Sequence, residues 1–257
     1  MLIAAGFLLF GGLYFGFNTK PAKFKTVEKQ RQLASVSTDV NSLLADSKAN
    51  LDAEDRTSVQ LLENEVSSAL IDSAKVALLM RLSSLWYSLE RPAIAGHYAE
   101  KVAEIKKDED AWSIAGTTYS ICVEKEKEEK VRSFCTQRAI QSLENAASLN
   151  PSNLQHKVNL ALVQAENPPA DNPMKGILML IELNEKYPNN PLILTQLGRL
   201  AIKTGQFQKA VERLEQALTI EPNNQKAICL MVQAYEGLGN KVNAQEFQSK
   251  CDNLSGR

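Results

Sequence analysis

The chain has 257 residues, of which 44% are hydrophobic and 23% are charged, and its formal net charge is −1. This is ordinary globular composition, and the near-neutral charge excludes the overall basic field that would hold a nucleic-acid backbone. Only 12 glycines and 9 prolines interrupt a sequence in which Ala, Leu, Glu, Gln and Lys dominate every long segment after residue 26. Because these residues favour helices, the sequence predicts an all-α protein that does not bind nucleic acid.

The first segment, MLIAAGFLLFGGLYFGF at residues 1–17, carries no charged side chain. A helix of this length would extend about 26 Å, close to the roughly 30 Å hydrocarbon core of a bilayer. The segment lacks the basic start and the small residues that a signal peptidase requires, so we expect an uncleaved transmembrane anchor in contact with the lipid bilayer. Gly12 and Gly16 form a GxxxG pattern, which favours close pairing of two such helices.

Basic residues follow the anchor, whereas only the amino terminus of the chain precedes it. They are Lys20, Lys23, Lys25, Lys29 and Arg31, against one acidic residue, Glu28. By the positive-inside rule this asymmetry favours the cytoplasmic side of the membrane over the periplasmic side for the rest of the chain. This expectation assumes that no basic segment precedes Met1, because such a segment would balance the basic residues that follow the anchor.

Two amphipathic helices are expected after a short juxtamembrane linker at residues 18–25, which contains Pro21 and several lysines. Within residues 26–75, hydrophobic side chains recur at steps of three and four. They are Leu33, Val36, Val40 and Leu43, and then Val59, Leu62, Val66 and Leu70. Neither run contains three clean heptads, so we favour a helical cap on the following domain over a dimerising coiled-coil stalk.

Residues 191–224, PLILTQLGRLAIKTGQFQKAVERLEQALTIEPNN, closely resemble a tetratricopeptide repeat, a unit of two antiparallel helices. Gly198 and Ala210 are small at the positions where the two helices cross. Gly205 supplies the turn backbone without steric cost, and Pro222 ends the second helix.

The same frame continues in both directions and predicts about five repeats over residues 76–254. Their ranges are 76–108, 109–153 with a long insertion, 154–190, 191–224 and 225–254. The resemblance implies a right-handed superhelix of stacked helical hairpins, whose first helices line a concave groove. The predicted architecture is therefore this superhelix, preceded by the anchor and the two amphipathic helices.

Reactive side chains are few and scattered. The two histidines, His97 and His156, lie in different repeats, and the four cysteines form no C-x-x-C pair, so neither a metal site nor a cofactor is expected. The sequence contains no Gly-rich phosphate loop and no recognised nucleophile or metalloprotease motif. We therefore predict a protein that is not an enzyme.

The resemblance implies that a peptide from a partner protein binds in the groove. In the repeat frame, the groove positions are Ser113, Thr117, Val158, Leu162, Thr195, Arg199, Cys229 and Gln233. Arg199 is the cation that is placed to bind a carboxylate. Chaperone-binding members of the family hold a terminal carboxylate with a polar clamp, which is absent here because Val158, Leu162 and Thr195 occupy clamp positions.

The charged run CVEKEKEEKVRSFC at residues 122–135 forms the centre of an insertion of about three helical turns. If the first helix alone is longer, the turn falls near Ser133 and the two cysteines lie far apart. If both helices are longer, Cys122 and Cys135 nearly face each other. No turn-forming residue marks the second geometry and the cytoplasm is reducing, so we expect free thiols on a helical spur at residues 120–135.

Our leading hypothesis is a membrane-anchored tetratricopeptide scaffold or adaptor at the bacterial inner membrane, which recruits partner proteins through the groove and the spur. The alternative is a structural or accessory subunit of a larger membrane complex. In layout the chain resembles cytoplasm-facing regulators of envelope biogenesis, and also periplasmic accessory subunits of the Sec translocon or of cytochrome c maturation.

Overall fold

A computed structural model describes residues 40–255 of the chain. It divides the chain into two compact units, Met1–Arg56 and Thr57–Arg257. The predicted anchor with Gly12 and Gly16, the linker and the first part of the amphipathic segment lie outside the described residues. Among the residues that the structure does describe, no helix is long and apolar enough to cross a membrane.

The described part of the first unit is helical. A helix spans residues 40–49, and α3 (Ala53–Ser68) begins in this unit and continues into the next. The carboxylate of Asp52 accepts a hydrogen bond from the backbone amide of Asp55 at 2.8 Å, so Asp52 caps α3.

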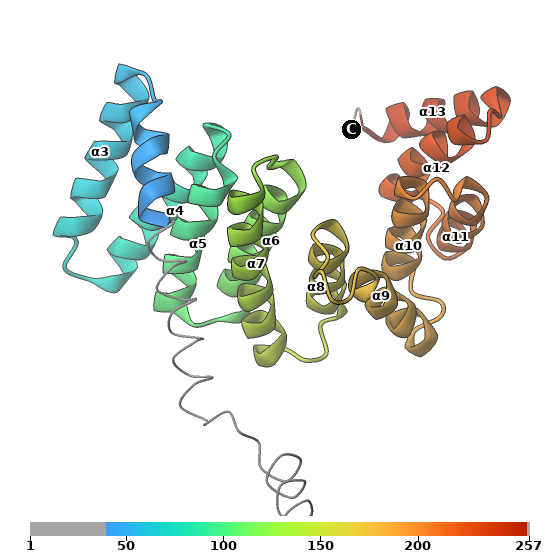
Figure 1. Cartoon of the computed structure of the whole chain (residues 1–257), viewed down its shortest axis with the longest axis horizontal. Coiled ribbons are helices and arrows are strands. Elements are labelled where there is room, and N and C mark those ends of the chain that lie inside the picture. Colours follow the sequence, from blue (N-terminus) through green and yellow to red (C-terminus); the bar gives the residue numbers. More distant parts are fainter. Residues whose placement is uncertain (1–39, 256–257) are drawn as a thin grey trace, which may run out of the picture. The chain divides into compact units, whose positions relative to one another are not determined.

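The second unit is a succession of antiparallel helical hairpins (Figure 1). After α3, the hairpins are α4 (Asp72–Ser88) with α5 (Pro92–Lys106), α6 (Glu109–Lys125) with α7 (Glu129–Leu149), α8 (Leu154–Glu166) with α9 (Lys175–Lys186), α10 (Pro191–Lys203) with α11 (Phe207–Ile220), and α12 (Gln225–Gly237) with α13 (Lys241–Ser255). Residues 40–255 contain no strand, so the all-α prediction is confirmed for this part of the chain.

The first helix of each of the last four hairpins begins at an Asp or Asn cap. The side chains of Asp108, Asn153, Asn190 and Asn224 accept hydrogen bonds from backbone amides in the first turns of α6, α8, α10 and α12. Such a cap contributes about 1 kcal/mol by satisfying an amide that has no partner within the helix. The sequence therefore sets where each of these helices starts, and so where its groove-facing side chains lie.

Glycine allows the closest helix crossings. A Cβ atom added at Gly198 would lie 2.7 Å from Cγ of Leu214, and one added at Gly176 would lie 2.3 Å from the backbone oxygen of Ala161. Gly205, with φ of +72°, forms the turn between α10 and α11 in a conformation that other residues rarely adopt.

The structure decides between the two geometries of the long insertion. Both α6 and α7 are longer, the turn lies at residues 126–128, and Cys122 is disulfide-bonded to Cys135 with a Cα–Cα distance of 6.0 Å. The expected free thiols are therefore wrong. Glu126 replaces the missing turn residues, because its carboxylate accepts hydrogen bonds from the backbone amides of Lys127 and Glu128 at 2.8 and 3.0 Å.

A second disulfide closes the last hairpin. Cys229 of α12 and Cys251 of α13 have a Cα–Cα distance of 5.0 Å. Both pairs satisfy the distance range of roughly 4.4–6.8 Å that the bond requires, and no cysteine among the described residues is free.

Candidate functional site

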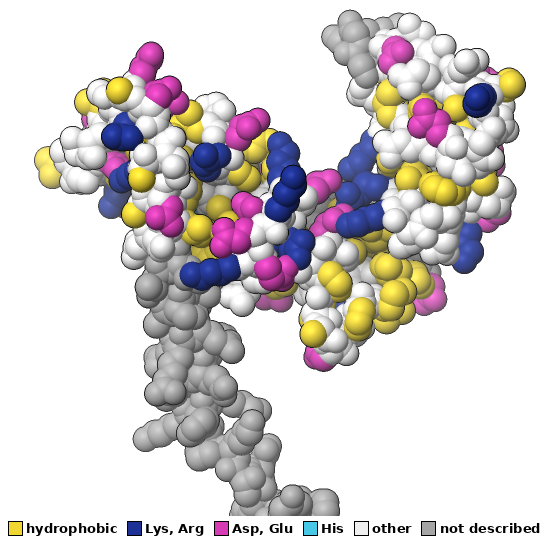
Figure 2. All heavy atoms as spheres, turned by 45° about the horizontal axis from the view of Figure 1, so that its top comes forward, with side chains coloured by type: hydrophobic (Ala, Val, Ile, Leu, Met, Phe, Trp, Pro, Cys, Tyr) yellow, Lys and Arg dark blue, Asp and Glu magenta, His cyan; other side chains and the backbone are white. Residues whose placement is uncertain are grey.

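The candidate site is a pocket of about 140 Å³ that is lined by the first helices of four successive hairpins. We call it the Arg199 pocket. Its lining residues are Thr117, Ser120, Ile121 and Glu124 of α6, Asn159, Leu162, Val163 and Glu166 of α8, Arg199 of α10, and Lys226 of α12. Basic and acidic side chains lie together where this face of the molecule is hollowed (Figure 2).

A chain of ion pairs crosses the pocket. Arg199 lies 3.6 Å from a carboxylate oxygen of Glu124 and 3.4 Å from one of Glu166. Lys203, one turn beyond Arg199 on α10, forms an ion pair with the same Glu166. The helices α6, α8 and α10 are therefore linked electrostatically across the surface that a ligand would contact.

Lys226 adds a second cation to the wall of the pocket. Burial lowers the pKa of Lys226, the nearby Arg199 lowers it further, and Glu124 acts in the opposite direction. Lys226 also borders a neighbouring hollow of about 370 Å³, which α10 and the turn before α12 line together with it. Lys226 thus borders both hollows, whereas Arg199 lines the first alone.

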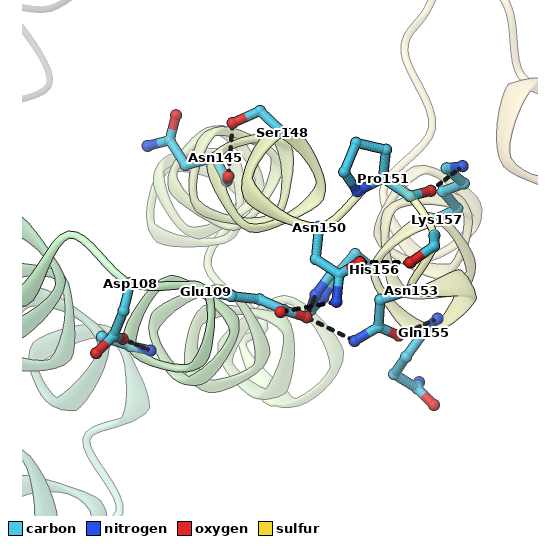
Figure 3. A network of polar contacts seen from close by, with 12 residues as sticks. Asp108, Glu109, Asn145, Ser148, Asn150, Pro151, Asn153, Gln155, His156 and Lys157 are labelled. Atoms are coloured by element: carbon cyan, nitrogen blue, oxygen red, sulfur yellow. Dashed lines mark hydrogen bonds and ion pairs between the residues drawn. The ribbon is translucent and has the colours of Figure 1, made fainter.

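A polar cluster at the other end of α6 sets the spacing of α6 and α8 (Figure 3). The carboxylate of Glu109 accepts hydrogen bonds from the side-chain amides of Asn150 and Asn153, at 2.9 and 2.7 Å, and lies 2.6 Å from Nε2 of His156. These contacts lower the pKa of Glu109 to about 2, the hydrogen bond from Asn153 having the largest effect. The cluster joins the start of α6 to the start of α8, and so positions two walls of the pocket.

A second polar cluster is buried between α5, α6 and α7. Tyr119 donates a hydrogen bond to Glu100 at 2.8 Å, and Arg138 donates another at 3.1 Å. Burial raises the pKa of Glu100, against the opposing effect of Arg138. Burial also lowers the pKa of the neighbouring His97 to about 4, and Lys101 and Arg138 contribute to this shift.

The structure brings together three of the eight predicted groove residues: Thr117, Leu162 and Arg199 all line the Arg199 pocket. Ser113 is partly exposed and Gln233 is exposed, but neither lines that pocket. Val158 is buried and Cys229 is disulfide-bonded, so neither presents a free side chain to a ligand, whereas the largely buried Thr195 lines the neighbouring hollow that Lys226 borders.

The sequence reasoning missed the charged residues Glu124, Glu166 and Lys226. A signal was present for two of them. Glu124 lies seven residues after Thr117, and Glu166 lies four residues after Leu162, so each continues the helical face of a residue that was identified. Within the described residues, no group of three or more His, Cys, Asp or Glu side chains is placed to hold a metal ion.

Comparison with known proteins identifies part of this fold. Residues 201–247 match the tetratricopeptide repeat family. The match spans α11, α12, the end of α10 and half of α13, and it confirms the prediction of tetratricopeptide repeats in this chain. No curated relative matches the chain.

Solved structures of tetratricopeptide repeat type resemble the chain weakly. PilW, described as a widely conserved type IV pilus biogenesis factor, is 17% identical, with a TM-score of 0.47 over 71% of this chain and 78% of its own. MamA from Desulfovibrio magneticus RS-1 is 16% identical, with a TM-score of 0.42 over 70% and 94%. YrrB, described as a TPR protein with an unusual peptide-binding site, is 16% identical, with a TM-score of 0.39 over 76% and 90%. At these values the likeness carries no argument about what this chain binds.

Proposed function

We propose that this protein is a non-enzymatic interaction scaffold, which binds a segment of a partner protein across the first helices of its tetratricopeptide hairpins. One observation carries the proposal: the Arg199 pocket is lined by α6, α8, α10 and α12 together. An extended segment lying there would contact several hairpins at once. In a stacked array of repeats, each repeat adds its own contacts to an extended ligand, so the binding energy is distributed over several repeats.

Membrane attachment is a second part of the proposal. Residues 1–17 are apolar and uncharged, and we propose that they hold the protein in a bacterial inner membrane as a single-pass anchor in contact with lipid. The GxxxG pattern of Gly12 and Gly16 offers a surface on which two anchors would pair.

For the folded part we propose the oxidising, periplasmic side of this membrane. The basic residues after the anchor favour the cytoplasm. The two cysteine pairs favour the opposite side, because disulfides persist in oxidising compartments and are rare in the cytosol. We give more weight to the cysteines, since two separate pairs lie at bonding distance. Alkylation under denaturing conditions, with cells lysed directly into the reagent, tests this: both pairs should resist the reagent until a reductant is added, and free thiols would place the domain in the cytoplasm.

The exposed side of α9 favours a second candidate function, as an accessory subunit of a larger membrane complex. Met174, which caps this helix, and Leu178 and Ile181 within it are exposed, and the helix does not line the Arg199 pocket. Exposed apolar side chains in a row are typical of a contact surface. A partner on α9 would leave the groove free for another, as a scaffold within a complex requires.

A paired capture experiment tests the groove. The tagged full-length chain is recovered from detergent-solubilised membranes as the wild type, as Asn159→Trp and as Glu182→Trp. Asn159 lines the Arg199 pocket, so the indole would fill it, whereas Glu182 is exposed on α9. We expect a defined partner with the wild type and with Glu182→Trp, and its loss with Asn159→Trp. Equal recovery with all three would contradict binding in the groove, and loss only with Glu182→Trp would favour the surface on α9.

A further inference from the structure

Arg199 forms an ion pair with a carboxylate that belongs to the hairpin next but one before its own in the chain. It belongs to α10, and its ion pair with Glu124 connects it to α6, while α8 lies between these helices in the chain. The second pair, with Glu166, connects it to α8 itself. Two of the protein's own carboxylates therefore approach the guanidinium on the surface that a ligand would use.

Neither carboxylate binds Arg199 closely. The two N–O distances are 3.6 and 3.4 Å, whereas charge-assisted hydrogen bonds between these groups are about 2.7–2.9 Å long. Nε of Arg199 is buried and has no hydrogen-bond partner. The guanidinium, which can hold a carboxylate by two parallel hydrogen bonds, makes no such bidentate contact here. Its capacity to bind a carboxylate is therefore largely unused.

The two acidic residues differ in how firmly they are held. The Glu166 side chain is 13% exposed and is also paired with Lys203. The Glu124 side chain is 61% exposed, at the longer of the two distances. An exposed ion pair contributes only about 0–1 kcal/mol to stability. Glu124 is therefore the carboxylate that a ligand's carboxylate would displace from Arg199 with a small loss of free energy.

The remaining surroundings favour an anionic ligand with an aliphatic neighbour. Lys226 lines the same pocket, and Glu124 also acts on it, opposing the lowering of its pKa by burial and by Arg199. The side chains of Ile121, Leu162 and Val163 provide an apolar wall beside the two cations. A pocket of about 140 Å³ accommodates one or two side chains of a peptide rather than a folded domain.

We propose that the Arg199 pocket binds an acidic side chain of a partner peptide, and that Glu124 occupies the guanidinium as an internal competitor which this carboxylate displaces. The proposal rests on the proposed function and names the chemistry of the partner. In the bound state, the partner's Asp or Glu pairs with Arg199 and Lys226, and an adjacent aliphatic residue contacts Leu162. Glu166 stays paired with Lys203 and continues to hold α8 against α10.

Fluorescence anisotropy tests this with two mixtures of short fluorescein-labelled peptides that have blocked termini and are randomised over Ala, Leu, Ser and Gly. One mixture carries a central Asp or Glu, and the other carries Asn or Gln at that position. The full-length chain in detergent should bind the acidic mixture more tightly, and added salt should reduce the difference because it screens the charges.

Two substitutions should act in opposite directions on the acidic mixture. Arg199→Gln should weaken its binding by about 10-fold or more, and Arg199→Lys should restore part of the affinity. Glu124→Gln should tighten its binding by about 2- to 5-fold, because the competitor is gone. Misfolding does not explain a gain in affinity, so the second variant keeps the test valid if the first is unstable. Glu182→Gln removes the same charge from α9 and should change nothing.

Three results would overturn the inference: equal binding of both mixtures, weaker binding by Glu124→Gln, or stronger binding of a matched mixture that carries a central Lys or Arg. The last would assign Glu124 and Glu166 as the receptor of a basic segment. If Asn159→Trp still loses the captured partner, the groove remains the binding surface and only the chemistry of the ligand is wrong.

Discussion

In the hairpin of α6 and α7, the sulfur-bearing residues Cys122 and Cys135 are fully buried, whereas Cys229 and Cys251 in the hairpin of α12 and α13 are partly exposed. The helices around the two bonds differ as well. The second helix α7 buries side chains along its length, including Phe134 next to the bond, while in the described part of α13 only Ala244 is buried and Phe247 packs partly buried against the core. α13 is the last helix that the structure describes, and most of its side chains are exposed.

From this difference we infer that the two disulfides stabilise the protein in different ways. In α6/α7 the disulfide lies within a packed core, where Tyr119 and Phe134 contact edge to face, so it and the packing stabilise the same structure. In α12/α13 the disulfide holds a helix most of whose described side chains are exposed. We therefore expect the first bond to affect global stability, and the second to affect mainly the local opening of α13.

The largest effect is expected from Cys122→Ala combined with Cys135→Ala. The bond closes a loop with a sequence separation of 13, and removing a native disulfide of this kind costs about 2–4 kcal/mol. The two smaller side chains would also leave unfilled space in the core. Urea denaturation should show the loss in the free energy of unfolding of the full-length chain. An unchanged midpoint would mean that packing alone holds this hairpin.

Tyr119→Phe should cost about 1–3 kcal/mol, because it leaves the buried Glu100, which is 5% exposed, without one hydrogen-bond donor. Tyr235→Phe is the matched change in α12, where the hydroxyl donates to Glu215 at 3.3 Å near the surface. It should cost less than about 0.5 kcal/mol. The same urea experiment measures both, and similar losses would remove the contrast between the two hairpins.

For Cys229→Ala combined with Cys251→Ala we expect a global loss below about 1 kcal/mol, together with loss of amide protection in α13. Loop entropy alone predicts the reverse order, because the sequence separation here is 22 rather than 13. Hydrogen exchange with mass spectrometry separates the two views. Uniformly faster exchange in all helices, with a larger fall in stability than in the first double variant, would favour the loop-length argument.

The smallest effect concerns pH. The pKa of Glu109 is lowered from 4.5 to about 2 by its hydrogen bonds, so its contribution to stability is present above pH 4.5 and is lost as the pH falls towards 2. Thermal unfolding of the wild type and of Glu109→Gln should therefore converge over this window. Glu182→Gln serves as the exposed control. A constant difference between wild type and Glu109→Gln from pH 6 to pH 3 would contradict the linkage.

The repeat frame was predictable because each of its signals is local. Gly198 has to be small where two helices cross, and the spacing from Gly198 to Gly205 and Pro222 fixes one hairpin regardless of what surrounds it. The groove faces of α6, α8 and α10 were predicted from the same period, which is why Thr117 and Leu162, predicted as groove positions, both line the Arg199 pocket.

The remaining features depend on contacts that are distant in sequence. Helical period assigns Val158 to a face, but the stacking of the hairpins decides that it packs against Leu180 and Ile193 instead of facing the groove. The turn at residues 126–128 relies on the side chain of Glu126 rather than on a turn-forming residue, so the geometry with facing cysteines was considered but not favoured. The pair between Arg199 and Glu124 connects helices two hairpins apart, and no periodicity in the sequence marks it.

Site-specific photo-crosslinking in native membranes tests most directly that partners bind in the groove. A photoreactive residue is placed at Thr117 or Asn159, which line the Arg199 pocket, and at Leu178 or Ile181, which are exposed on α9. We predict that the two groove positions yield the same discrete adduct, and that this adduct is absent with the positions on α9. Adducts from α9 alone, or none from the groove, would contradict the central claim that the first helices of the hairpins form the binding surface.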